Sequence, residues 1–288
     1  MPYISMTYKS LVLSLEGGRI MDRTLFTPAM IETFRVCKRA YELAFLKPRD
    51  ESSLKLSTIC KRFLLKAVAE VNRSRINTLQ EAQRFIGQHW NALRLEDNAP
   101  EDIQNKSIQA FRFAYRTLNS YVSRPYRPRG SEIVAVNTTM RARVPHAGVY
   151  LEDVFDLILW HPDQKVLEIV DFHLNPLRAF DPAWPAPSIL VKQFLCDKLK
   201  SRLPFEKIRL TFVQLQSQGQ QIRSFDLDES VFRVHWPEII STLSEMKSAR
   251  EFPPHVSEVC KRCEVLEPCS SMGTFTGECR NDVVYRSA

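Results

Sequence analysis

Four β-rich segments, interrupted by one helical segment, place the strongest constraint on the fold of this chain. Residues 131–144, 148–160 and 165–172 are rich in β-branched and aromatic residues and are separated by short breaks. Residues 188–203 repeat apolar positions at helical spacing, and residues 207–216 are again β-rich. These periods predict three strands, a helix and a fourth strand. That order predicts an α/β fold, with a mixed sheet and a crossover helix.

Helical patterns precede the β-rich half. From about residue 54 to 124, apolar residues recur every three or four positions and only one glycine interrupts them, which predicts an insertion of three or four helices. Thr27 and Pro28 predict the N-cap and first turn of an earlier helix that carries Cys37. A last helix is expected from Glu229 to Arg250, where paired prolines follow.

Length and charge narrow the class of protein. A chain of 288 residues with 44% hydrophobic content fits one globular domain, which we place at residues 24–288. Residues 1–23 have no clear period and are expected to form a tail, a candidate for disorder. Neither a membrane-spanning run nor a secretory cleavage site is recognisable, so we expect a cytoplasmic protein. The net charge of +7 favours polyanionic partners such as nucleic acid.

Three cysteines near the end of the chain follow the pattern C-x2-C-x5-C, at Cys260, Cys263 and Cys269. In a reducing compartment, clustered cysteines indicate metal ligation rather than disulfides. A fourth ligand is needed. Cys37 is the natural candidate because basic residues beside it favour a thiolate, and Cys279 competes with it.

Four thiolates suit either zinc or an iron–sulfur cluster, and spacing alone leaves both open. A site that joins Cys37 to Cys269 closes a loop of more than two hundred residues, so the site would act as a staple. Cys60 and Cys196 lie on apolar helical faces, where free cysteine behaves as a small hydrophobe.

Two aspartates fall on neighbouring predicted strands. Asp156 lies within VFDLIL and Asp171 ends LEIVD, so adjacent strands could bring both carboxylates to one Mg²⁺ or Mn²⁺ ion. The alternative is that both aspartates only mark strand ends. Burying an aspartate inside an apolar strand, however, costs free energy when the carboxylate has no partner. Glu168 lies an odd number of residues from Asp171 and is expected to face away.

The motifs together resemble the RecB-like nucleases of the PD-(D/E)XK superfamily, which include the CRISPR-associated four-cysteine exonucleases and the AddB nuclease domain. Those proteins have a helix with one cysteine, a helical insertion, a G-x-(I/V)-D-x-(I/V) strand, an (I/V)-(I/V)-D-Y-K strand, a helix that starts with glutamine, and C-x2-C-x5-C. Counterparts occur here in the same order between residues 27 and 269. The resemblance implies a restriction-endonuclease-like nuclease core at about 131–250 and an iron–sulfur region at 251–288 together with Cys37.

The resemblance also implies roles for single residues. Asp156 and Asp171 would bind Mg²⁺ or Mn²⁺, Gln193 is the glutamine of the helix, and the four cysteines would hold a [4Fe–4S] cluster. In such a site the metal polarises the scissile phosphate and activates water, while a lysine positions that water and offsets developing charge. Here the lysine of the motif is His173, and Lys192 is the alternative group to orient the water.

Basic residues supply candidate contacts to DNA. Arg124, Arg127 and Arg129 surround Tyr126, a combination that contacts phosphates and stacks on bases in single-strand binders; a solvated loop is the alternative. The histidine that the family has on an early helix is also missing. Lys61 or Arg62 stands near its position, and these two with Lys66 either line a channel or form a solvated face.

We therefore predict a metal-dependent DNA nuclease, an exonuclease on single-stranded ends or flaps, that carries a [4Fe–4S] cluster. A second hypothesis is a catalytically degenerate nuclease fold. It would bind nucleic acid or dock onto a helicase, an integrase or another DNA-processing protein. A third hypothesis is a structural protein stapled by zinc.

Overall fold

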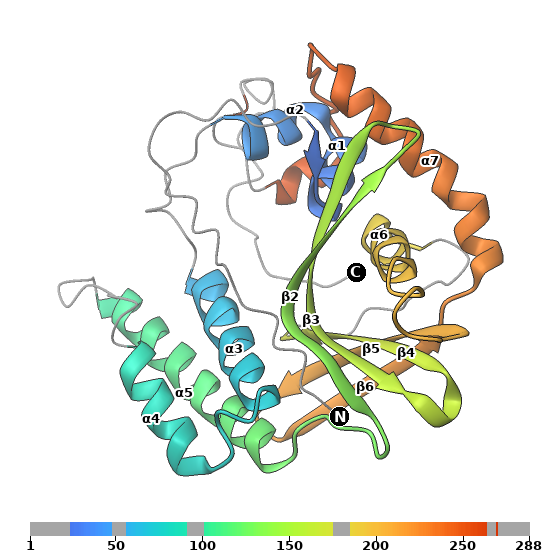
Figure 1. The fold of residues 1–288 in the computed structure, drawn as a ribbon. Helices are drawn as coiled ribbons and strands as arrows, with labels where there is room; N and C mark the ends of the chain where they lie inside the picture. The colour runs from blue at the N-terminus through green and yellow to red at the C-terminus, as the bar shows by residue number, and fades with distance from the viewer. Residues whose placement is uncertain (1–23, 48–55, 91–100, 175–184, 264–268, 270–288) are drawn as a thin grey trace.

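The computed structural model describes residues 24–47, 56–90, 101–174, 185–263 and 269. A six-stranded mixed sheet lies between two groups of helices (Figure 1), which confirms the α/β class. The strands are β1 (Leu25–Phe26), β2 (Glu132–Val144), β3 (Val149–His161), β4 (Val166–His173), β5 (Lys207–Gln216) and β6 (Gly219–Asp226). The helices are α1 (Pro28–Val36), α2 (Lys38–Tyr41), η1 (Glu42–Leu46), α3 (Leu56–Asn72), α4 (Leu79–Trp90), α5 (Glu101–Ser123), η4 (Pro162–Gln164), α6 (Pro187–Asp197), α7 (Glu229–Ser248) and η5 (Glu258–Arg262).

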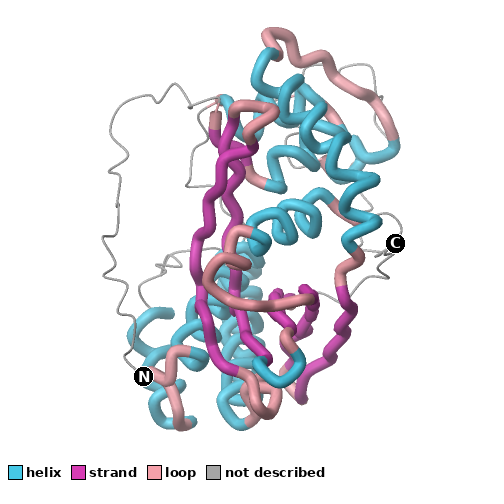
Figure 2. The backbone as a smooth tube through the Cα atoms, turned by 45° about the vertical axis from the view of Figure 1, so that its right-hand side comes forward, coloured by secondary structure: helices cyan, strands magenta, loops and turns pink. Residues whose placement is uncertain are grey.

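The connections of the sheet follow the predicted order. Strands β2, β3 and β4 are antiparallel neighbours, and β4 pairs in parallel with β5 across the crossover helix α6. Strand β6 is antiparallel to β5, and β1 is parallel to β3. The hairpin of β2 and β3 is long and bent, as Figure 2 shows from a second direction. Helix α6 lies on the inner side of this bend (Figure 1).

One edge of β3 has no pairing partner in its middle within the described strands. Strand β2 pairs with the opposite edge from Val149 to Trp160, so β1 and β4 both pair with the first edge. Strand β1 pairs only at Tyr150 and Leu151, and β4 pairs only from Leu157 onward. Residues 152–156 therefore have no ladder partner on that edge within the described strands. Asp156 lies at this opening, opposite Asn137 of β2, whose φ of 46° is left-handed.

A hydrophobic core lies on each face of the sheet. Buried residues of β4 alternate between the two cores, and this alternation shows which face each polar residue of β4 points to. Leu167 and Ile169 belong to the core beneath α1, α6 and α7, whereas Val170 and Phe172 belong to the core beneath α3, α4 and α5. Because successive side chains of a strand point to opposite faces, Asp171 faces α6. Glu168 faces the other side, as its odd separation from Asp171 predicts.

Several predicted elements need correction. The crossover helix ends at Asp197 rather than near residue 203, because the chain continues in tight turns, with Leu199 N bonded to Cys196 O. Strands β1 and β6 were not predicted. Strand β1 has two residues, and β6 is an edge strand with largely exposed side chains and no hydrophobic alternation. Helices α3, α4 and α5 fill the predicted helical region, but whether they are an insertion stays a prediction. Within the described chain, no helix combines the length and apolar character that membrane crossing requires.

Candidate functional site

Helix α6 carries two polar side chains into the interior. Pro187 stands in its first turn, and residues 189–196 are all buried, so the helix has no solvent face over two turns. Lys192 and Gln193 are each 7% exposed. A buried ammonium is costly unless charges and hydrogen bonds compensate it, so the partners of Lys192 define the site.

The Lys192 ammonium lies between two carboxylates. Its Nζ is 3.2 Å from Asp171 Oδ1 and 3.2 Å from Asp153 Oδ2, and it donates to the Val154 carbonyl at 3.2 Å. Burial opposes ionisation of Lys192, but the carboxylates of Asp171 and Asp153 outweigh burial and raise its pKa. The site thus contains a fixed positive charge and a carboxylate, Asp153, that the sequence did not indicate.

Asp156 faces the same opening from β3. Its Oδ2 accepts a hydrogen bond of 2.9 Å from the Phe172 amide of β4, so its carboxylate lies beside the residue that follows Asp171. Burial, together with the negative charge of Asp171, raises the pKa of Asp156 to about 6. The structure therefore brings the two predicted aspartates and Lys192 together.

We expect Asp156→Asn to stabilise the metal-free protein by about 2–3 kcal/mol at about pH 8. The pKa of Asp156 is about 6 in the folded protein against an ordinary value of 3.8, so ionisation opposes folding. The protonated Asp156 carboxyl stabilises the folded protein fully below its pKa in the unfolded chain. This stabilisation is lost as pH rises through about 6. Urea unfolding should show that the stability gained by Asp156→Asn shrinks toward zero below about pH 4. An equal gain in stability at about pH 8 and at about pH 4 would contradict this account.

His173 lies two residues after Asp171 on β4, and its catalytic role stays a prediction. Its ring packs edge-on against Phe212 at 5.1 Å between centroids, and its buried Nε2 has no hydrogen-bond partner among the described residues. Burial lowers its pKa, and the positive charges of Lys61 and Lys192 add to that effect against the opposing charge of Asp171. His173 therefore lies beside the aspartates as an uncharged group.

Gln193 and Lys61 complete the surroundings. Gln193 is buried next to Lys192 on α6, but it makes no hydrogen bond to either predicted aspartate within the described chain. Lys61 of α3 is exposed, as are Arg62 and Lys66. The charge of Lys61 favours ionisation of Asp156, so one basic residue of this helix acts electrostatically on the site.

The predicted DNA-binding segment lies on the other face of the sheet. Its Tyr126 hydroxyl donates to buried Glu168 Oε1 at 2.7 Å, and Glu168 Oε2 lies 2.6 Å from His161 Nε2. Gln220 of β6 donates to the Arg124 carbonyl at 2.6 Å. The three arginines of the segment are exposed and form no ion pair with another described residue: Arg124, Arg127 and Arg129.

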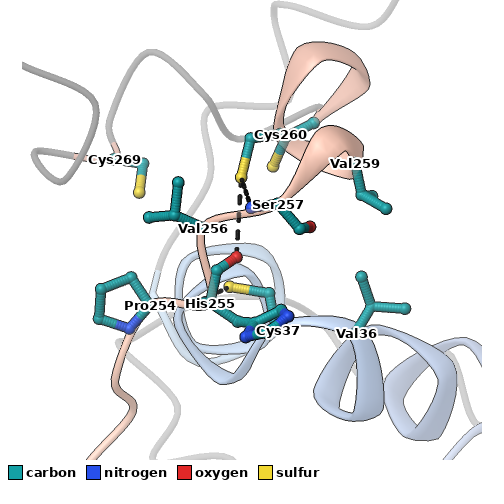
Figure 3. A pocket seen from close by; sticks show the side chains of 10 residues that line it. Val36, Cys37, Pro254, His255, Val256, Ser257, Val259, Cys260 and Cys269 are labelled. Carbon is teal, nitrogen blue, oxygen red and sulfur yellow. Dashed lines mark hydrogen bonds between the residues drawn. The ribbon is translucent and has the colours of Figure 1, made fainter. Parts of the chain in front are cut away.

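The four cysteines converge at the opposite end of the molecule. Cys37, Cys260, Cys263 and Cys269 are half-buried cysteines that form no disulfide in the described chain, and they line one pocket (Figure 3). The expectation that Cys37 lies within a helix is wrong. It has extended backbone between α1 and α2, with φ −159° and ψ 115°, and this break separates the two helices. Cys279 lies outside the described residues.

Backbone amides surround the thiols. The His255 amide donates to Cys37 Sγ at 3.3 Å, and the Ser257 amide donates to Cys260 Sγ at 3.4 Å. Such donors stabilise thiolates and tune clusters, so the residues fit a four-thiolate centre. No three His, Cys, Asp or Glu side chains of the described chain are placed to hold a single metal ion.

The other two described cysteines belong to the cores. Cys60 is 5% exposed and Cys196 is fully buried. Burial raises the pKa of the Cys60 thiol to about 11 and also raises that of Cys196. Both thiols stay protonated at neutral pH and pack as small hydrophobic groups, as expected.

Comparison with known proteins places the chain in a family. A family model described as the PD-(D/E)XK nuclease superfamily matches residues 25–270. The chain therefore belongs to the PD-(D/E)XK nuclease superfamily. The finer resemblance to RecB-like nucleases stays a prediction, because the matching description covers only the superfamily.

The search of curated proteins finds no match, whereas 13 chains of solved structures match. One of them, titled "Crystal structure of SSO0001", is 14% identical, with a TM-score of 0.27, and the match covers 73% of this chain and 96% of that chain.

Proposed function

We propose that this chain is a metal-dependent deoxyribonuclease, an exonuclease on single-stranded ends or flaps, that carries a [4Fe–4S] cluster. Membership of the nuclease superfamily supports a nucleic acid substrate and a divalent metal. The exposed arginines at 124, 127 and 129, which form no ion pair with the residues that the structure describes, support a contact with phosphates.

One observation carries the proposal. The Lys192 ammonium lies 3.2 Å from Asp171 Oδ1, and Asp156 bonds to the adjoining Phe172 amide. Two acids and a lysine are therefore assembled, although the lysine comes from the crossover helix instead of the strand. This arrangement supports Lys192 in the role of the motif lysine, whose position on the strand is occupied by His173.

Asp156 and Asp171 would hold Mg²⁺ or Mn²⁺, because both are oxygen donors at the same opening of the sheet. When bound, that ion would polarise the scissile phosphate and lower the pKa of a water molecule. Lys192 would donate a hydrogen bond to the attacking water and offset charge that develops on the phosphate. Its burial strengthens this effect, since the surrounding medium screens charge less than water does.

The four thiols support the cluster. They come from the junction of α1 and α2, from η5 and the residue that follows it, and from residue 269, and two of them accept amide hydrogen bonds. Their convergence across more than two hundred residues is what a staple requires.

The proposal is tested by cleavage of labelled single-stranded DNA. We expect cleavage with Mn²⁺, loss of cleavage after chelation, and recovery when Mn²⁺ is restored. Asp171→Ala should remain inactive at every Mn²⁺ concentration, because it lacks one of the two ligands. Cleavage that survives both chelation and this substitution would refute a metal-dependent site on these residues.

A specific observation also favours the catalytically degenerate alternative. The Lys192 ammonium is held by ion pairs with Asp153 and Asp171 and by a hydrogen bond to the Val154 carbonyl, and His173 is packed against Phe212. If this arrangement persists when metal and DNA bind, the fold binds nucleic acid or docks onto a DNA-processing partner without turnover. Salt-sensitive DNA binding with no cleavage in Mn²⁺ would establish this alternative.

A further inference from the structure

Asp153 is a half-buried carboxylate to which neither the sequence motifs nor the family resemblance gives a role. It lies on β3 three residues before Asp156, and its side chain is 19% exposed. Its Oδ1 accepts a hydrogen bond of 2.8 Å from the Val154 amide. Its Oδ2 is shielded from solvent and makes no directed hydrogen bond in the described chain. The charge of that oxygen is compensated by the Lys192 ammonium at 3.2 Å.

The position of the ammonium depends on Asp153. Lys192 has a long, flexible side chain with three donors and no rigid fork, so its contacts alone decide where Nζ stays. Asp171 Oδ1 holds it from one side at 3.2 Å, and Asp153 Oδ2 holds it from the other at 3.2 Å. Nζ also lies 4.7 Å from the centre of the Phe155 ring, which limits movement toward the core.

We propose that Asp153 is a positioning residue, which fixes the Lys192 ammonium beside Asp171 and shares its charge. Without Asp153, the ammonium would keep Asp171 and the Val154 carbonyl as its polar contacts in the described chain, so binding of another cation by Asp171 would leave it with the carbonyl alone. With Asp153, the ammonium keeps a second anchor and stays at the site. The consequence for cleavage rests on the proposed function, whereas the placement of Lys192 does not.

Glu152 offers a matched control on the same strand. It is the neighbouring carboxylate, but its Oε2 accepts from Arg141 Nη2 at 2.6 Å and from Nε at 3.0 Å. Glu152→Gln therefore removes the same charge one residue away without touching Lys192. Asp153→Asn is a near-isosteric change that keeps the side-chain oxygen for the Val154 amide, so we expect the variant to fold.

The placement is tested on the metal-free protein with an amine-reactive acylating reagent, followed by mass spectrometry of the peptide that contains Lys192. We expect Asp153→Asn to increase the acylation rate of Lys192 about tenfold, because neighbours in one ion-pair network couple by about that factor. Glu152→Gln should leave the rate unchanged. An unchanged rate in Asp153→Asn, or an equal rise in both variants, would overturn the proposal.

The consequence for cleavage is tested at saturating Mn²⁺ and DNA. Asp153→Asn should lower kcat about tenfold without raising KM, and it should lower kcat by less than about twofold when Lys192 is already methionine. An equal loss in both backgrounds would show that Asp153 acts independently of Lys192, and would overturn the proposal. If the wild type does not cleave at all, the proposed function fails, and the acylation result alone decides the placement.

Discussion

Replacement of Lys192 with methionine is expected to reduce Mn²⁺-dependent cleavage by about 10²–10³-fold, the range found when one preorganised charge-stabilising donor is lost. The same assay on His173→Ala is expected to show a change of less than about threefold, because that ring makes no polar contact among the described residues and carries no charge. Lys192→Arg keeps the charge with a different geometry and should fall between the two.

Folding must be separated from chemistry in this experiment. Methionine at position 192 leaves Asp153 and Asp171 without their ammonium, and breaking a buried ion pair costs about 3–5 kcal/mol. Circular dichroism and thermal unfolding should therefore accompany each assay. A folded Lys192→Met protein with wild-type cleavage, combined with an inactive His173→Ala protein, would transfer the role to the histidine.

Substitution of Cys263 by serine is expected to remove the visible absorbance of the anaerobically purified protein and to lower its stability by about 4–5 kcal/mol, as loss of a link across a very long loop predicts. The cluster is proposed to join Cys37 to the end of the chain, so its loss frees both segments. Urea unfolding under anaerobic conditions measures the change in stability.

Cys60→Ala provides the control for this substitution. That cysteine is buried in α3 and does not line the pocket of the other four, so the absorbance should persist and only a small packing loss should follow. Equal behaviour of the two variants would contradict a cluster at the pocket. A colourless wild-type protein that contains zinc would mean that the four cysteines still join the two segments but hold zinc instead of an iron–sulfur cluster.

Four of the six strands could be predicted from the sequence, because alternation and helical spacing depend on local burial. Asp156 and Asp171 fall on adjacent strands as predicted, and Lys192 contacts Asp171 from the crossover helix. The break at Cys37 was missed, since the apolar spacing continues through it from α1 into α2. The Cys37 amide caps α1 by donating to the Thr33 carbonyl, and its Sγ accepts from the distant His255 amide, a contact that no local pattern encodes.

Asp153 was missed for a different physical reason. In a regular strand, residues 153 and 156 point to opposite faces. Here the alternation changes along β3: Leu151 and Phe155 belong to the core beneath α6, and so do Ile158 and Trp160. The change occurs opposite the left-handed Asn137, where β2 and β3 bend. Such an irregularity places both aspartates near Lys192 and leaves no periodic signal.

The hydrogen bond from the His255 amide to Cys37 Sγ spans 218 residues of sequence, and this span bears on the order of synthesis. Helix α1 is synthesised early, whereas its partner α7 and the cysteine segment follow β6. The six strands and helices α3 to α5 are complete before α7, so they can fold while α1 still lacks these partners. A chain whose translation stops before residue 255 would therefore contain both aspartates and Lys192 but lack the partners of Cys37.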